Sequence, residues 1–290
     1  MRAVSLPSIE LLSPAKVNFR LEVLRRRTDG YHEIRTILQR ISLSDTLRIA
    51  LKERGGISVI ADSPDLPVDE GNLAYRAASS LLEEAKARVG IELTIQKEIP
   101  ISSGLGGGSS NAASTLMGLN RILELDFPKG RLMEIGARIG ADVPFFILEK
   151  PALATGIGEK LQPVEIRPSI WLVLVNPGWE VSTRWAYEGL NFELTKRPIH
   201  IKLPPFFNDI GQVAHILHND LESVTIEAYP EIEGIKAELL SHGAEGSLMT
   251  GSGPTVFGIF CHKGRAESAY QKLNAQYAER RWRVYLAKCI

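Results

Sequence analysis

The first hundred residues contain short stretches in which apolar and polar positions alternate, which is the period of a half-buried strand. Asp29-Gly30 is a strong turn signal, and the prolines and aspartates of residues 62–71 favour a loop. Residues 1–12 are interpreted as a short extension with no assigned role. The first four predicted strands follow one another without a helix between them, which favours an α+β class over a doubly wound sheet. The predicted strands are residues 17–23, 34–41, 46–51, 57–60 and 91–95.

Other segments repeat their apolar residues at helical spacing. A helix is predicted from Asn72, a favourable N-cap, to about Val89, with Gly90 beyond its end. The apolar run Asp142–Phe146 contains Pro144, which we expect to keep it out of a helix. Further helices are predicted from about residue 112, over about 128–140, after the segment 219–222 and over 267–278.

A second half of the chain opens with the buried strand predicted at Trp171–Val175. We place a loose boundary near residues 163–168, which divides the chain into domains 1–165 and 166–290. Residues 195–208 contain three prolines and are expected to form a loop. Later strands are predicted at residues 257–260 and 282–287.

Composition narrows the classes of function. The 34 lysines and arginines balance 34 aspartates and glutamates, which argues against a general affinity for nucleic acid. Two cysteines make neither a disulfide framework nor a metal spacing. Pro7 and Glu10 stand where a signal peptide needs an apolar run, and no segment is apolar enough to cross a bilayer. We therefore expect a cytoplasmic monomer or weak homodimer without nucleic-acid or membrane partners.

A glycine- and serine-rich segment follows the predicted strand 91–95 and precedes a helix, and it is predicted to bind phosphate. Glycines let a ligand approach the backbone, and the N–H groups of a helix start attract anions. Neither the P-loop nor the Gly-x-Gly-x-x-Gly pattern is met. A flexible turn that caps the helix is the alternative. The segment consists of Pro100, Ile101, Ser102, Ser103, Gly104, Leu105, Gly106, Gly107, Gly108, Ser109 and Ser110.

Two charged residues could act on a phosphoryl group. Lys16, on a predicted strand, could hold phosphate or stabilise an alkoxide, although most lysines simply face solvent. Asp142 lies among small and apolar residues, where it could accept a proton from a hydroxyl group. An aspartate that caps a turn is the alternative for Asp142.

Two further clusters could bind a substrate. Tyr31 and His32 follow a turn, where the rings could stack on a base and hydrogen-bond to it; a turn with a core tyrosine is the alternative. Residues 249–255 contain Gly251, Ser252 and Gly253, which could form a second backbone cradle or only a tight turn.

Taken together, these motifs resemble the GHMP kinases. Residues 100–110 resemble the nucleotide loop of that superfamily, and residues 250–255 resemble its third motif. The matches run in the same order from about residue 13 to 260, so nearly the whole chain is covered. Within the superfamily, the resemblance is strongest to a kinase of the non-mevalonate isoprenoid pathway, and the segments that carry it are residues 15–18, 27–32, 140–146, 219–222 and 252–258.

The resemblance implies a two-domain α+β fold, with an N-terminal domain like domain 2 of ribosomal protein S5 and a ferredoxin-like C-terminal domain. It also implies transfer of the ATP γ-phosphoryl group, with Mg²⁺, to the 2-hydroxyl of a cytidine diphosphate-linked methylerythritol in the non-mevalonate isoprenoid pathway. The metal ligands stay unassigned. Other kinases of the superfamily, of homoserine or mevalonate type, and a non-catalytic nucleotide-binding regulator are the competing interpretations.

Residue roles follow from the same resemblance. Lys16 and Asp142 match catalytic positions, residues 100–110 match the ATP loop, and Asn72 and Leu73 border the adenine. Tyr187 is expected to be the second aromatic ring around the cytosine, with Trp185 as its rival. The implied substrate contacts are Asn18, Tyr31, His32, Thr183, Tyr187, Gly251, Ser252 and Gly253.

Overall fold

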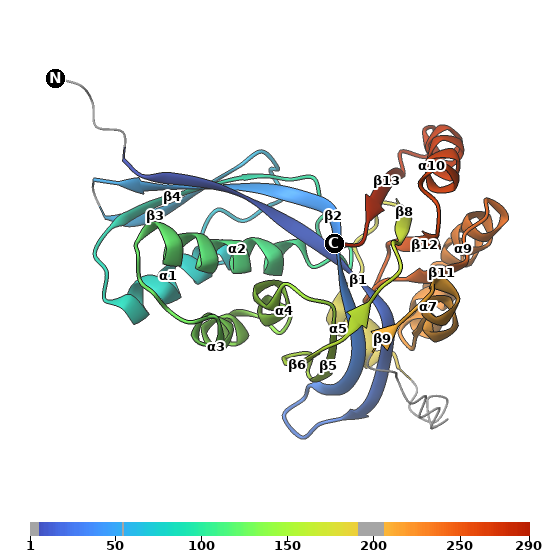
Figure 1. The fold of residues 1–290 in the computed structure, drawn as a ribbon, viewed down its shortest axis with the longest axis horizontal. Coiled ribbons are helices and arrows are strands. Elements are labelled where there is room, and N and C mark those ends of the chain that lie inside the picture. The colour runs from blue at the N-terminus through green and yellow to red at the C-terminus, as the bar shows by residue number, and fades with distance from the viewer. Residues whose placement is uncertain (1–5, 54, 191–205) are drawn as a thin grey trace. The chain divides into compact units, whose positions relative to one another are not determined.

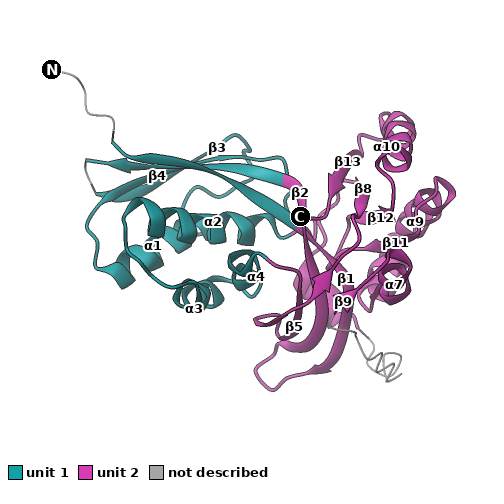
Figure 2. Ribbon diagram, viewed as in Figure 1, with its two compact units in different colours: residues 1–15, 44–101, 106–149 teal, residues 16–43, 102–105, 150–290 magenta. Residues whose placement is uncertain are grey.

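The computed structural model describes residues 6–53, 55–190 and 206–290, whose order in the chain is shown in Figure 1. They form two compact units that interleave along the sequence (Figure 2). Because these units group residues by contact, the expected domain boundary near residue 165 stays a prediction. Unit 1 comprises the described residues up to Ala15, Ser44–Ile101 and Gly106–Glu149; unit 2 comprises those of Lys16–Leu43, Ser102–Leu105 and Lys150–Ile290.

Two long strands, β1 (Ser8–Arg26) and β2 (His32–Lys52), contribute residues to both units. The sequence predicts two separate strands at 34–41 and 46–51, and this is wrong. Residues 42–45 contain neither glycine nor proline, so nothing ends the strand between them. The expected extension at residues 1–12 is also shorter than predicted, because β1 already begins at Ser8.

Unit 1 combines strands with four helices: β3 (Gly56–Ala61), β4 (Gly90–Gln96), α1 (Leu73–Ala85), α2 (Gly107–Ile122), α3 (Lys129–Ile139) and α4 (Val143–Leu148). The strand β4 pairs antiparallel with Thr46–Lys52 of β2 and parallel with β3. Helix α2 approaches β2 closely, since a Cβ at Gly118 would lie 2.5 Å from Ile49 Cδ1. This packing fixes α2, whose first turn follows the glycine segment.

Two helix predictions in unit 1 need correction. Helix α1 is capped by Asn72 as predicted, but it ends at Ala85, where Lys86 turns into the left-handed region. The run that contains Pro144 was expected to be non-helical, yet it forms α4. Pro144 lies in the first turn, where its missing N–H would have no intrahelical partner, so the helix tolerates it.

Unit 2 holds the remaining elements: β5 (Ala152–Gly156), β6 (Lys160–Pro163), β7 (Glu165–Ile166), β8 (Trp171–Asn176), α5 (Thr183–Glu188), β9 (Phe206–Phe207), α7 (Ile210–Ile216), β10 (His218–Asn219), α8 (Glu222–Ala228), α9 (Glu231–Ser241), β11 (Gly246–Met249), β12 (Val256–Phe260), α10 (Lys263–Tyr277) and β13 (Arg283–Lys288). Strands β11-β12-β8-β13 form an antiparallel sheet in that order. Helices α9 and α10 pack on it. Most of the expected loop 195–208 lies outside the described residues.

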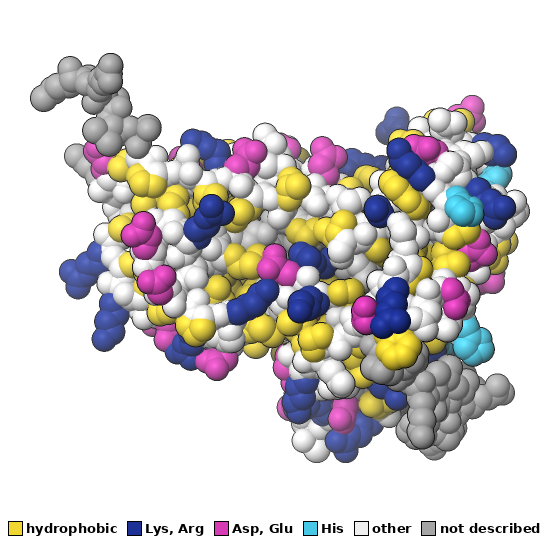
Figure 3. Space-filling view, viewed as in Figure 1, with side chains coloured by type: hydrophobic (Ala, Val, Ile, Leu, Met, Phe, Trp, Pro, Cys, Tyr) yellow, Lys and Arg dark blue, Asp and Glu magenta, His cyan; other side chains and the backbone are white. Residues whose placement is uncertain are grey.

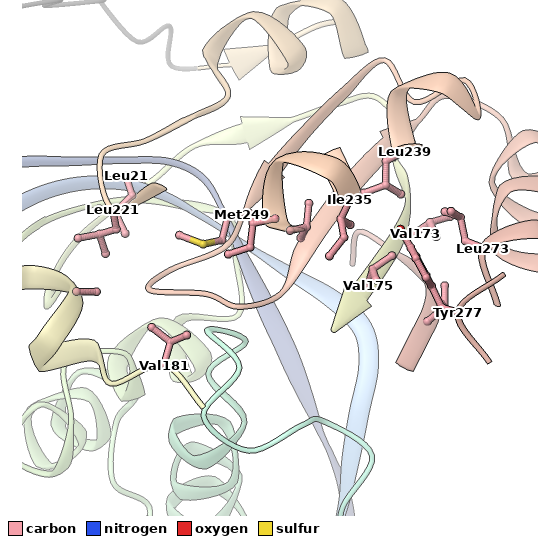
Figure 4. Packing of buried hydrophobic residues seen from close by; sticks show 14 of the residues in the cluster. Leu21, Val173, Val175, Val181, Leu221, Ile235, Leu239, Met249, Leu273 and Tyr277 are labelled. Carbon is pink, nitrogen blue, oxygen red and sulfur yellow. The ribbon is translucent and has the colours of Figure 1, made fainter. Parts of the chain in front are cut away.

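The sheet of unit 2 is covered on both faces at β12. Val256 and Phe260 belong to a buried apolar cluster that includes Leu239 of α9. Figure 4 shows part of this cluster, with Leu239 labelled. On the other face, the Phe257 ring packs against Phe19 of β1, with 6.0 Å between the ring centroids. This two-sided burial holds the turn that leads into β12, which contains the second glycine-rich motif.

Charged side chains of both signs are interspersed on the face drawn in Figure 3. This distribution accords with the zero formal net charge. Among the described residues, no helix combines the length and apolarity that a membrane span requires.

Candidate active site

The glycine segment leaves β4 and runs into the first turn of α2. Gly104 and Gly106 have φ values of +78° and +72°, a backbone region that favours glycine. Gly106 occupies the N-cap of α2 and offers no side chain to satisfy the first helical N–H groups. Together with the positive end of the helix, these N–H groups can hold an anion.

Two polar atoms in the first turns of α2 are buried without a hydrogen-bond partner among the described residues. They are Ser110 Oγ and Asn111 Oδ1. Buried polar atoms in folded proteins nearly always have a partner, so a bound group or an ordered water is expected at these two atoms. The Ser110 hydroxyl can donate to a phosphate oxygen or offer its oxygen to a cation. The site therefore fits a nucleotide phosphate with its metal ion.

Asp45, a residue that the sequence analysis missed, holds both ends of the glycine segment. Its fully buried carboxylate accepts backbone N–H donors from Glu98 and Ile99 at 3.0 and 2.9 Å, just before the glycines. It also accepts Asn111 Nδ2 at 3.0 Å, just after them, and the ammonium of Lys97. The carboxylate thus fixes the base of the loop within unit 1.

The signal for Asp45 lies in the pattern of β2. Ile41, Leu47 and Ile49 are fully buried, and Asp45 stands in the same alternate positions of the strand. A carboxylate in a buried apolar row is costly unless donors reach it. The position alone therefore marks Asp45 as a partner for donors elsewhere in the chain.

In unit 2, Lys16 lies where two glycine segments meet. Its backbone N–H donates to Leu105 O at 2.9 Å, and its Nζ lies 3.6 Å from the place of a Cβ at Gly251. A Cβ at Gly104 would lie only 2.2 Å from Thr250 O. The two backbones can approach this closely because neither Gly104 nor the neighbouring Gly251 carries a Cβ, and a Cβ at Gly251 would lie 3.2 Å from Gly104 O. The structure thus brings together three clusters that the sequence analysis singled out.

The second glycine-rich turn is held by Asn219, from the motif at residues 219–222. Asn219 Nδ2 donates to the carbonyls of Met249 and Gly251, each at 2.8 Å. At the same turn, Ser252 Oγ lies 3.2 Å from Thr183 Oγ1. Two residues predicted to contact the substrate are therefore neighbours in unit 2.

The aromatic residues expected around a base lie in different settings. The His32 and Tyr187 rings are stacked, with centroids 5.1 Å apart and an interplanar angle of 24°. This spacing is that of two rings in direct contact, so no base fits between them. Tyr31 is 60% exposed, so its ring is accessible to a base. Trp185 instead packs edge-on against Tyr229, with 6.4 Å between centroids.

The surroundings of His32 favour the neutral form of its imidazole, because they lower its pKa. Its partial burial lowers the pKa of His32 below the ordinary value, and the charge of Arg26 lowers it further, while Glu188 opposes both. A neutral imidazole carries one donor and one acceptor nitrogen. It can therefore hydrogen-bond to an uncharged base.

The strand β1 carries a row of buried polar residues at alternate positions: Lys16, Asn18, Arg20 and Glu22. The Glu22 carboxylate accepts from Arg20 Nη2 at 2.6 Å and from Arg35 Nε. Burial raises the pKa of Glu22, but the hydrogen bonds from Arg35 and Arg20 outweigh it and hold the pKa below the ordinary value. The charged residues Arg20 and Glu22 of this row are thus paired with charged groups.

The other predicted site residues belong to unit 1. Asp142 takes the N-cap position of α4, yet its side chain makes no capping hydrogen bond. Leu73 Cδ1 lies 3.5 Å from the place of a Cβ at Gly108, so Leu73 borders the glycine segment. Asn72 is engaged as the cap of α1. Since Asp142 and Lys16 belong to different units, their pairing stays a prediction.

The comparisons with known proteins agree with this chemistry. The family model of the GHMP kinases N terminal domain matches residues 72–150, and that of the GHMP kinases C terminal domain matches residues 201–279. A 4-diphosphocytidyl-2-C-methyl-D-erythritol kinase of Geobacter sulfurreducens is 51% identical over 268 residues, covering 92% of this chain and 95% of that protein. This chain belongs to the 4-diphosphocytidyl-2-C-methyl-D-erythritol kinase family. The predicted membership of the GHMP kinases is thereby confirmed.

Solved structures show the same fold. A crystal structure of a 4-(cytidine 5'-diphospho)-2C-methyl-D-erythritol kinase matches this kinase with a TM-score of 0.79 and 33% identity, covering 97% of this chain and 99% of that one. The homoserine kinase from Cytophaga hutchinsonii gives a TM-score of 0.78 over 99% of this chain and 96% of that one, but only 18% identity. The latter likeness concerns the fold alone. The predicted α+β, two-domain GHMP kinase fold is confirmed.

Proposed function

We propose that this kinase transfers the γ-phosphoryl group of ATP to the 2-hydroxyl of 4-diphosphocytidyl-2-C-methyl-D-erythritol, as a step of non-mevalonate isoprenoid synthesis. The observation that supports it most is the meeting of Lys16 with two glycine segments in unit 2, where Lys16 Nζ lies 3.6 Å from the Cβ place of Gly251. An ammonium beside two glycine segments suits a transferring phosphoryl group. Membership of the kinase family supplies the substrate class.

The residues take complementary roles in this reaction. The N–H groups at the start of α2 hold the ATP phosphates, and the Ser110 hydroxyl adds a donor. The Lys16 ammonium stabilises the charge on the reacting oxygens. Asp142 orients the 2-hydroxyl and receives its proton as the new O–P bond forms and the bond from the γ-phosphorus to ADP breaks.

A Mg²⁺ ion fits the same site, because it binds mainly to phosphates and needs few protein ligands. Ser110 Oγ is the described oxygen best placed to contribute, since it is buried beside the helix start without a partner among the described residues. When bound, the ion neutralises part of the phosphate charge. The remaining ligands are unassigned.

The cytidine end of the substrate is assigned to Tyr31, His32 and Tyr187. The His32 and Tyr187 rings stack directly on each other, and the Tyr31 ring is exposed. A base stacked on the exposed Tyr31 ring could receive in-plane hydrogen bonds at its edge from the imidazole of His32. Thr183 and Ser252 are assigned to the methylerythritol diphosphate part. Because ATP is supplied in the cytoplasm, we place the reaction there, with the enzyme as a monomer or weak homodimer.

The test is a coupled assay of ADP release on candidate alcohols, with and without the cytidine diphosphate group on the acceptor. We expect turnover only with that group. Lys16→Ala and Asp142→Asn should each lower kcat by about a hundredfold or more. Equal turnover of homoserine or mevalonate would reassign the substrate. Nucleotide binding without turnover of any alcohol would indicate a regulator instead.

A further inference from the structure

The Asn18 side chain is engaged at both ends by buried protein groups. Its Oδ1 accepts Lys16 Nζ at 2.6 Å and Thr250 Oγ1 at 3.2 Å, while its Nδ2 donates to Thr36 Oγ1 at 2.8 Å. Each of these four residues is at most 4% exposed. These hydrogen bonds give the Asn18 amide a defined orientation inside unit 2; the expected contact of Asn18 with the substrate stays a prediction.

Proton counting fixes which way the amide points. The Thr36 hydroxyl has one proton, and it donates that proton to Arg20 O at 2.6 Å. Its oxygen can then only accept, so it must face the donor end of the Asn18 amide. The Thr250 oxygen accepts the backbone N–H of Asn18 at 3.0 Å, and its proton points to Oδ1. Both threonines therefore turn the amide oxygen toward Lys16.

The consequence concerns the ammonium of Lys16. A neutral acceptor at 2.6 Å fixes the position of the charged group by a charge-assisted hydrogen bond. An amide does so without cancelling the positive charge, whereas a carboxylate at the same place would neutralise it. The arrangement thus fixes the position of the Lys16 ammonium beside the glycine segments.

We propose that Asn18 and Thr36 are positioning residues for Lys16: Thr36 orients the Asn18 amide, and the amide holds the ammonium at the phosphoryl group. This inference rests on the proposed role of Lys16 in catalysis. Thr36 touches no reacting group, so its effect on the reaction passes through Asn18.

The decisive variant is Thr36→Val, which keeps the shape of the buried side chain and removes the acceptor. We expect kcat to fall about tenfold, with both KM values within about twofold of wild type, because misplacing a reacting group slows chemistry more than binding. Thr36→Ser should restore kcat. Thr115→Val is the matched control, since this buried hydroxyl donates to Asn111 O within its own helix α2.

A second variant, Asn18→Asp, retains the size of the side chain and places a negative charge on the ammonium. We expect kcat to fall about a hundredfold without a matching rise in KM. In the double variant Lys16→Ala with Thr36→Val, the threonine change should have no further effect on kcat, since the group that it positions is gone. A purely structural role for Thr36 would still slow this double variant.

The outcomes separate the two proposals. If Lys16→Ala loses activity while Thr36→Val and Asn18→Asp behave like the Thr115→Val control, the positioning inference is overturned and the proposed function stands. If Lys16→Ala retains wild-type turnover, the proposed catalytic role of Lys16 fails and the positioning inference fails with it, whereas loss of turnover on the cytidine-linked acceptor by the wild-type enzyme would refute the proposed function. A rise in the acceptor KM at constant kcat would return Asn18 to substrate binding. Should Thr36→Val unfold, Asn18→Asp and Thr36→Ser decide the question.

Discussion

The carboxylate of Asp45 offers the sharpest test of how the nucleotide loop is held. In Asp45→Asn, one side-chain oxygen can still accept the N–H groups of Glu98 and Ile99. The new NH₂ group, however, faces Lys97 Nζ and Asn111 Nδ2, which are both donors. The substitution therefore leaves a buried ammonium opposite another donor.

The expected cost follows from the burial of the pair. Lys97 and Asp45 side chains are 7% and 0% exposed, and breaking such a buried ion pair from one side costs about 3–5 kcal/mol. Lys97→Met should cost less, about 1–3 kcal/mol, because three donors still satisfy the carboxylate. The double variant should be more stable than Asp45→Asn alone, since no unpaired charge is left, with a coupling of about 2 kcal/mol or more.

The measurement is equilibrium urea unfolding of the four proteins, followed by circular dichroism, with the ATP KM of each in the coupled assay. Asp45→Asn should also raise the ATP KM, because the loop loses the group that joins its two ends. The acceptor KM should stay unchanged. Two results would refute this role of Asp45: additive changes in the free energy of unfolding in the double variant, or an unchanged ATP KM in a destabilised Asp45→Asn.

Three further results are expected. Gly104→Ala should lower Tm and raise the ATP KM, because its Cβ would lie 2.2 Å from Thr250 O. Gly130→Ala is the control: its Cβ would meet nothing within 4 Å, so Tm should not fall and the ATP KM should not rise. The pKa of Glu22 is depressed in the folded state, so the ionised carboxylate stabilises the fold at pH values above its ordinary pKa of about 4.3. The difference in free energy of unfolding between wild type and Glu22→Gln should therefore narrow as the pH falls below that value. A difference that does not change with pH would contradict this. Tyr31→Ala should raise the acceptor KM far more than the ATP KM, and equal effects would remove its assignment to the base.

The local parts of the fold could be predicted well from the sequence. The strand–glycine–helix order from β4 to α2, the cap at Asn72 and the strand β8 all follow from patterns within a few residues. The errors were local ambiguities as well. Pro144 can end a helix or begin one, and only the surrounding chain decides which occurs.

The site was predictable only in its conspicuous residues. The glycine segment and Lys16 stand out by composition or motif, but the groups that hold them do not. Thr250 bonds to Asn18 across 232 positions, and Asp45 reaches Asn111 across 66. A single threonine or aspartate has no pattern of its own, and its role is defined by partners that only the folded chain brings near.

The contact between the two glycine turns sets a limit on how this enzyme can diverge. Main-chain atoms meet there, with a Cβ at Gly251 falling 3.2 Å from Gly104 O. No graded series of side chains can tune that spacing, since the smallest addition already collides or strains the turn. New acceptor preferences would have to arise at positions with room to vary, such as the exposed ring of Tyr31, while the phosphoryl-handling centre is inherited intact or lost.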